Sequence, residues 1–158
     1  MYMRLQDRGD GLFEGEDFAD DPATTVTEGY PCDADFSFWG NLVNRNAVLS
    51  WSPETTGSEL RLSIPVAEPG RYELLTTTVL TKRGGEFEVA LEDQVLTASL
   101  DLFHDSIFPK PVAASLGEMD LSKGLAVLRF RFKSRHPDST ESAQLSLDTL
   151  QLRKVHEP

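Results

Sequence analysis

The chain has 158 residues and carries 15 Lys and Arg against 26 Asp and Glu, a formal net charge of −11. This length suits one domain with one core, and the charge argues against nucleic acid and anionic membranes as partners because both would be repelled. Cys32 is the only cysteine, so an intramolecular disulfide and a four-sulfur metal site are excluded.

Targeting and membrane signals are weak in this sequence. No apolar run approaches the roughly 18 residues of a membrane-spanning helix, and the opening MYMRLQDRGD lacks the apolar core of a signal peptide. A domain taken from a larger secreted protein would also lack a signal peptide, and a single cysteine is compatible with any compartment. The localisation therefore stays open.

The first third of the chain predicts few regular elements. We expect residues 1–10 and 156–158 to be mobile and residues 11–155 to form a single domain. The segment LFEGEDF, residues 12–18, predicts a short strand, whereas residues 19–37 show no sustained period and predict mostly loop. NAVLSW predicts another strand, and its Trp51 is expected in the core.

Alternation with period two dominates from residue 58 onward. In SELRLSIPV, Leu60, Leu62 and Ile64 share one side of a strand, which predicts one buried and one solvated face. EPGRYELLTTTVL follows, and its dipeptide Pro69-Gly70 is typical of a turn. The sequence therefore predicts a hairpin between these two strands.

The remaining strands are separated by short turns, with the Glu92-Asp93 corner and the Lys123-Gly124 turn among them. They are predicted in GEFEVALE, VLTASLDL, SLGEMDL, LAVLRFRFK and AQLSLDTLQL. About eight or nine strands with little or no helix predict an all-β fold, an antiparallel β-sandwich of the jelly-roll kind.

The last predicted strand changes phase. Leu145 and Leu147 share one side, but Leu150 and Leu152 share the other, so the alternation slips at Asp148-Thr149. A slip of one residue indicates a β-bulge, and bulges re-aim side chains near sites and sheet edges. The alternative is a strand buried on both faces, with Asp148 against solvent or capping a loop.

Candidate ligand-binding residues lie in two segments. An exposed aromatic face with polar groups nearby is typical of a ligand-binding site, and Trp39 with Asn41 and Asn44 offers this combination in a predicted loop. Asp101 and His104, in DLFHDSIF, are candidates for the rim of such a site. The alternative is that Trp39 fills the core and that DLFHDSIF is structural.

A basic stripe stands out on an otherwise acidic protein. Arg129, Arg131 and Lys133 alternate with apolar residues, and Arg135 extends the row. The favoured interpretation is a solvated sheet face whose charges discourage edge aggregation. The alternative is a docking surface for a partner or an acidic sugar.

The order of several short segments resembles a known family. FEGEDF, LSW, GSELRLSIPVAEPGRYELLTT, EVALEDQVL, SLGEMDLSKGLAVLRFRF and LSLDTLQL together are similar to carbohydrate-binding modules of families six and thirty-five, within the galactose-binding-like jelly rolls. Sandwich domains that accompany some bacterial glycoside hydrolases are similar as well. The resemblance spans roughly residues 12–152 and implies carbohydrate as the partner.

The resemblance also implies a structural calcium ion. In such modules an acidic pair near the start and an Asp in the final strand bind calcium, and the matching positions here are Glu14, Glu16 and Asp148. Calcium prefers oxygen ligands, carboxylates among them, and period two would put Glu14 and Glu16 on one face. The alternative is solvated surface carboxylates. RHPDSTES departs from the glycine-rich, Asn-containing loop that usually contacts the sugar in this family.

No sequence motif predicts an enzyme. The chain has no G-x-S-x-G, H-E-x-x-H, Walker or G-x-G-x-x-G pattern. We therefore predict a non-catalytic carbohydrate-binding or accessory module of a glycan-degrading system. The alternative is a structural sandwich that mediates contacts with other domains of a larger protein or in a homo-oligomer without binding sugar.

Overall fold

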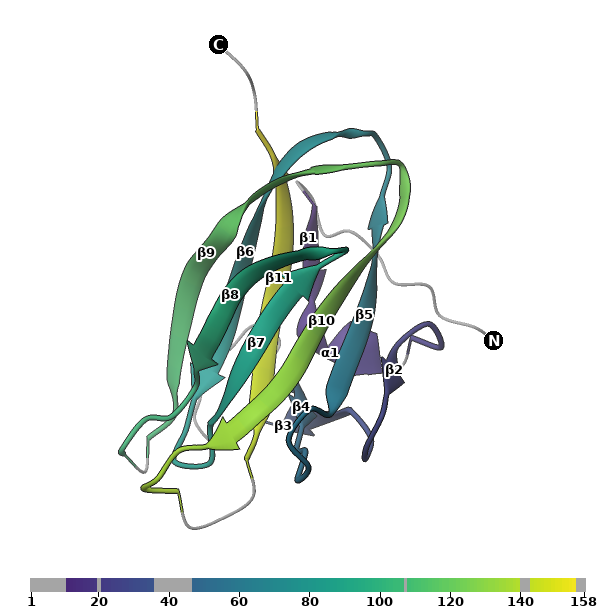
Figure 1. Cartoon of the computed structure of the whole chain (residues 1–158). Coiled ribbons are helices and arrows are strands. Elements are labelled where there is room, and N and C mark those ends of the chain that lie inside the picture. Colours follow the sequence, from purple (N-terminus) through teal and green to yellow (C-terminus); the bar gives the residue numbers. More distant parts are fainter. Residues whose placement is uncertain (1–10, 20, 36–46, 107, 140–142, 156–158) are drawn as a thin grey trace.

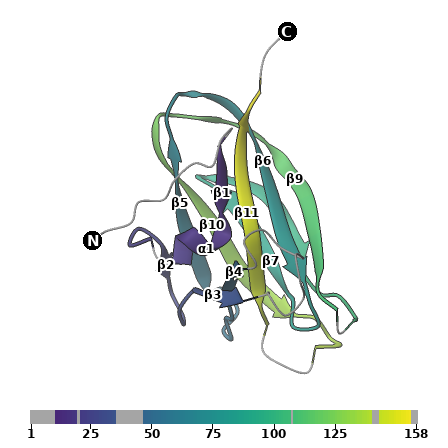
Figure 2. The same ribbon diagram turned by 180° about the vertical axis from the view of Figure 1, so that it is seen from behind.

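The computed structural model describes residues 11–19, 21–35, 47–106, 108–139 and 143–155. These residues form two β-sheets packed face to face, with antiparallel pairing throughout both sheets (Figures 1 and 2). The predicted all-β sandwich is confirmed. No helix in the described part of the chain is long and apolar enough to cross a membrane.

The first sheet has the order β3-β4-β11-β6-β9, with β1 pairing along β11. Its strands are β1 (Leu12–Glu14), β3 (Cys32–Asp35), β4 (Ala47–Trp51), β6 (Gly70–Leu80), β9 (Lys110–Leu121) and β11 (Leu145–Lys154). The second sheet has the order β2-β5-β10-β7-β8. Its strands are β2 (Thr25–Val26), β5 (Glu59–Val66), β7 (Gly85–Leu91), β8 (Gln94–Asp101) and β10 (Gly124–Arg135).

The core lies between the two sheets and follows the alternation of the sequence. In β5, Leu60, Leu62 and Ile64 are fully buried while Arg61 is exposed. The same alternation runs from Ala126 to Phe132 in β10, which pairs with β5, and as far as Val89 in β7, which pairs with β10. Trp51 is buried, and its ring packs at an angle of 41° against that of Phe87, with the ring centroids 6.0 Å apart. Its predicted place in the core is therefore confirmed.

The predicted hairpin between residues 58–66 and 68–80 is wrong. β5 pairs with β10 and β2, whereas β6 pairs with β11 and β9 in the other sheet. The turn at Pro69-Gly70 therefore carries the chain from one sheet to the other. Alternation reports which face of a strand is buried, but both sheets bury one face, so it does not report which strand is the neighbour.

The first third of the chain is more regular than predicted. The strand at residues 12–18 ends at Glu14, and Gly15–Ala19 forms α1 instead. Residues 19–37, predicted as mostly loop, contain the short strands β2 and β3. Because β2 and β3 are so short, they leave no periodic signal in the sequence, and the strands in the described residues outnumber the predicted eight or nine.

The phase slip in the last strand is a β-bulge, as predicted. Leu147 pairs with Thr78 and Thr149 pairs with Thr77, so Asp148 is an extra residue in β11. The bulge lets Leu145 and Leu147 before it and Leu150 after it all reach the core. Asp148 itself is buried at this bulge, and bulges re-aim side chains.

Candidate functional site

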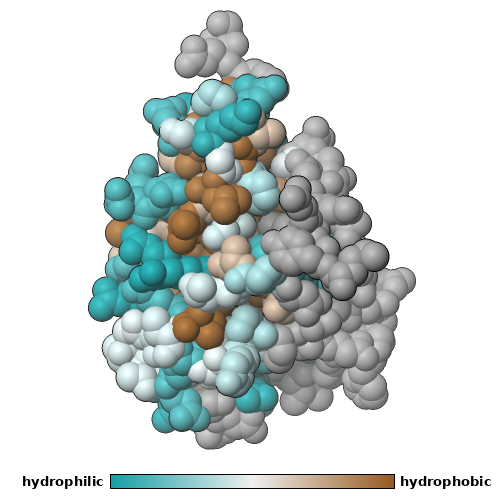
Figure 3. Space-filling view, turned by 90° about the vertical axis from the view of Figure 1, so that its right-hand side faces the viewer, coloured by the Kyte–Doolittle hydropathy of each residue, from teal (hydrophilic) through white to brown (hydrophobic). Residues whose placement is uncertain are grey.

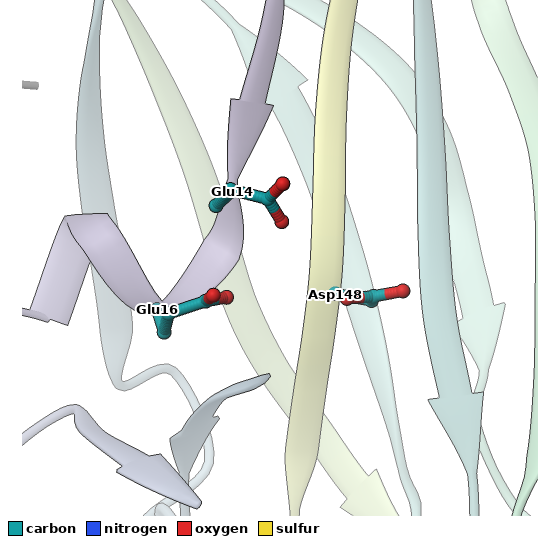
Figure 4. Close-up of side chains that lie close together, drawn as sticks. All are labelled: Glu14, Glu16 and Asp148. Carbon is teal, nitrogen blue, oxygen red and sulfur yellow. The ribbon is translucent and has the colours of Figure 1, made fainter. Parts of the chain in front are cut away.

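Three carboxylates meet beside the bulge. One oxygen from each of Glu14, Glu16 and Asp148 lies within 4.8 Å of the other two, and all three residues are buried, with 3%, 6% and 5% of their surface exposed. Figure 4 shows Glu14 at the end of β1 and Glu16 on α1, both turned toward β11, which carries Asp148. The sequence predicted these residues as one group, and the structure brings them together.

Period two is not what places the two glutamates together, because Glu16 belongs to α1 and not to a strand. A close backbone approach places them instead. A Cβ at Gly15 would lie 2.0 Å from the Leu147 carbonyl oxygen, so only glycine allows the junction of β1 and α1 to lie so close to β11. This contact is one residue from the bulge, and the three carboxylates therefore converge there.

Their chemistry fits a calcium ion. Calcium binds oxygen ligands at about 2.3–2.6 Å, so two ligands of one ion lie at most about 5.2 Å apart. The 4.8 Å limit that encloses the three carboxylate oxygens satisfies this requirement. Three buried acidic groups also repel one another unless a cation, protons or hydrogen-bond donors compensate them.

A second candidate region is the end of the sandwich where the loops after β2, β4, β6, β8 and β10 meet, at the bottom of Figure 1. Hydrogen bonds and a ring contact connect these loops one to the next. Gly57 donates a hydrogen bond to the Phe132 carbonyl, at the end of β10. The His136 ring then stacks on Phe103 at 3.8 Å, and His104 donates its backbone N–H to the Thr81 carbonyl. We call this region the loop end.

Glu28 holds two of these loops together. Its Oε1 accepts hydrogen bonds from the backbone N–H groups of Glu54 (2.7 Å) and Thr55 (2.9 Å) and from Ser58 Oγ (3.1 Å). Its Oε2 accepts one from Thr55 Oγ1 (2.8 Å). The backbone and hydroxyl donors of Thr55 and the N–H of Glu54 lower the pKa of Glu28 to about 2, because they stabilise the ionised carboxylate.

Tyr30 follows two residues later and is 88% exposed, more than any other large apolar side chain in the described residues. Between Glu28 and Tyr30 lies Gly29, with φ of +69°, in the left-handed region that favours glycine. The turn therefore presents the tyrosine ring to solvent. Sequence reasoning missed Tyr30 because a lone Tyr in a polar segment gives no periodic signal.

The predicted binding residues divide into two groups. Trp39, Asn41 and Asn44 lie outside the described residues, and their predicted role stays a prediction. Asp101 and His104 both lie at the loop end. Asp101 is exposed at the end of β8 and accepts the Phe103 N–H at 3.0 Å, and His104 is half-buried in the loop that follows.

The basic stripe lies on the outer face of the second sheet, as the alternation predicted. Arg129 donates to the Glu92 carbonyl at 3.0 Å, and Lys133 donates to the Ala98 carbonyl at 2.9 Å. Arg131 is flanked in register by Glu59 on β5 and Glu88 on β7. These pairings fit a solvated sheet face with locally compensated charges.

A groove of about 850 Å³ lies at the end of the sandwich opposite the loop end, and Phe13 in its lining directly precedes Glu14 of the acidic cluster. Phe13, Val66, Tyr72 and Leu152 supply its apolar lining. Charged residues border it, and Lys154 pairs with Glu68 at 3.1 Å. Figure 3 views the molecule from the side of β5 and shows hydrophobic residues gathered on its upper half, bordered by hydrophilic ones.

Comparisons with known proteins identify structures of similar fold. No protein-family model and no curated protein matches the chain. A xanthan lyase from Paenibacillus is similar over 98% of this chain and 14% of its own, with a TM-score of 0.73 and 14% identity. This chain thus spans about a seventh of that enzyme.

Isolated modules match over nearly their whole length. A family 35 carbohydrate-binding module from Clostridium thermocellum is similar over 91% of this chain and 97% of its own, with a TM-score of 0.60 and 12% identity. The CBM36-1 domain of a xylanase from the hindgut metagenome of Trinervitermes trinervoides is similar over 92% of this chain and 98% of its own, with a TM-score of 0.56 and 7% identity. The chain therefore has the jelly-roll fold of carbohydrate-binding modules.

Proposed function

We propose that this protein is a non-catalytic carbohydrate-binding module that binds its ligand at the loop end. The observation that carries the proposal is the exposed Tyr30 on a turn whose base is hydrogen-bonded to the neighbouring loop. An exposed aromatic ring offers apolar surface that a ligand can cover, with a favourable free energy of burial. The fold shared with modules of families 35 and 36 supports the same class.

The recognition follows from the chemistry of a sugar ring. One face of a pyranose carries C–H groups that stack on an aromatic ring, and its hydroxyls need hydrogen-bonding partners at the edge. Tyr30 supplies the ring. The adjacent loop after β4 carries Ser52 and Glu54, two exposed polar residues, and Asp101 and His104 lie at the same end.

Titration calorimetry against a panel of neutral and acidic polysaccharides tests the proposal. We expect weak binding of at least one glycan, and Tyr30→Ala should raise Kd about tenfold, which corresponds to about 1.4 kcal/mol. Leu125→Ala is the matched control, because Leu125 is 63% exposed at the far end of β10. No binding across the panel would favour the structural role of the sandwich, and loss of binding in Trp39→Ala alone would move the site to the predicted Trp39.

We further propose that Glu14, Glu16 and Asp148 bind a structural calcium ion. The buried cluster, its 4.8 Å spacing and its all-oxygen donor set support this assignment. The ion would join β1 and α1 to β11 and so stabilise the sheet, at a distance from the ligand contacts. Its role is therefore stability, and the measurement that tests it is thermal unfolding.

A further inference from the structure

The backbone just before Tyr30 is held unusually firmly for a surface loop. Besides the four hydrogen bonds to the Glu28 carboxylate, the Glu28 carbonyl accepts one from Trp51 Nε1 at 2.9 Å. Thr27 donates its N–H to the Glu59 carbonyl at 3.1 Å and accepts the Glu59 N–H on its hydroxyl at 2.9 Å. These partners belong to β4, β5 and the loop that connects them, so the base of the turn is tied to the sandwich.

We propose that Glu28 is the positioning residue of the Tyr30 platform, an inference that rests on the proposed function. Only Gly29 separates the two residues, so a rigid Glu28 limits where the tyrosine ring can lie. A binding site gains affinity when its groups are already ordered in the free protein, because less conformational entropy is lost on binding. Glu28 supplies that order.

Glu28 does not itself contact the sugar. A carboxylate offers about four acceptor positions, and the four donors from Glu54, Thr55 and Ser58 match that number. Its acceptor capacity is therefore used within the protein. Its effect on binding passes through the position of Tyr30.

The substitution Glu28→Gln tests this role because it keeps the shape of the side chain. It removes the negative charge and turns one acceptor atom into a donor, which faces a donor of the loop after β4. We expect Kd for the glycan to rise three- to tenfold. We also expect the NMR order parameter of the Tyr30 backbone amide to fall from about 0.85 to below about 0.6.

Glu73→Gln is the matched control. Glu73, like Glu28, is a half-buried, hydrogen-bonded glutamate; it accepts from Ser115 Oγ at 2.7 Å and from Arg153, and these interactions lower its pKa. It lies on β6, away from the loop end. Glu73→Gln should lower Tm without changing Kd or the Tyr30 order parameter. Thr55→Val, which removes a single donor, is the milder variant if Glu28→Gln does not fold.

The outcomes separate the two proposals. If Glu28→Gln or Thr55→Val lowers Tm but leaves the Tyr30 order parameter and Kd as in the wild type, Glu28 is merely structural and the inference is overturned. If Tyr30→Ala binds glycan like the wild type, the proposed loop-end site itself is wrong. If Tyr30→Ala weakens binding and Glu73→Gln matches Glu28→Gln in every readout, the effect is general destabilisation and the inference fails.

Discussion

Removal of calcium should lower the melting temperature of the protein substantially. A ligand that binds only the folded state stabilises it by about 2.7 kcal/mol when its concentration is about 100 times Kd. For a domain of this size each kcal/mol shifts Tm by about 2–4 °C, so we expect a difference of about 5–10 °C between millimolar calcium and excess chelator. Differential scanning calorimetry measures it directly.

The direction in which one substitution changes Tm is more diagnostic than the size of the Tm difference between calcium and chelator. Two charges 4.8 Å apart, the limit that encloses the cluster, repel by about 3.5 kcal/mol at an effective dielectric constant of about 20. Without calcium, Glu16→Gln removes part of this repulsion and should leave Tm unchanged or raise it. With calcium, the same variant loses a ligand, and its Tm should lie below that of the wild type.

Asp93→Asn is the matched control for this experiment, because Asp93 is an exposed acidic residue at the corner between β7 and β8. It should respond to calcium like the wild type. A wild-type Tm that is identical in calcium and in chelator would refute the reasoning. So would a Glu16→Gln variant that keeps the full calcium response.

Two further predictions concern the backbone and the acid range. Gly15→Ala places a Cβ against the Leu147 carbonyl, so we expect a loss of about 1–3 kcal/mol in chemical denaturation and a smaller calcium response; wild-type stability would contradict the close approach. Glu28 has a pKa of about 2 against an ordinary 4.5. Its stabilising contribution is therefore present above pH 4.5 and is lost as pH falls toward 2, and Tm in that range should fall more steeply for the wild type than for Glu28→Gln. Equal slopes would contradict this assignment.

The alternation of apolar residues predicted which face of each strand is buried better than it predicted which strands pair. The buried faces of β5, β7 and β10 follow directly from residues such as Leu62 and Phe130, because one face of each strand must leave water. The partner of each strand depends on contacts between residues far apart in sequence. β5 therefore pairs with β10 rather than with its neighbour in the chain, β6.

The residues of the acidic site could be predicted from the sequence, but the backbone geometry that brings them together could not. The resemblance to a family assigned Glu14, Glu16 and Asp148, and the phase slip at Asp148 independently marked the bulge. The expected strand through Glu16 does not exist, because the chain turns into α1 at Gly15. A glycine at which a Cβ would lie 2.0 Å from a carbonyl oxygen has no signature in sequence, since its role depends on the carbonyl opposite it.

At the loop end, sequence patterns predict even less of the contacts that form the site. Glu28 and its donors around Thr55 are 26 to 30 residues apart in sequence, and neither segment is periodic or apolar, so no local rule connects them. What connects them is the fold, which brings the loop after β2 beside the loop after β4. In our proposal, the engaged carboxylate two residues earlier helps to hold the exposed tyrosine in a defined place. A binding role for Tyr30 therefore depends on a contact that folding creates, and the Glu28→Gln measurement is the direct test of that dependence.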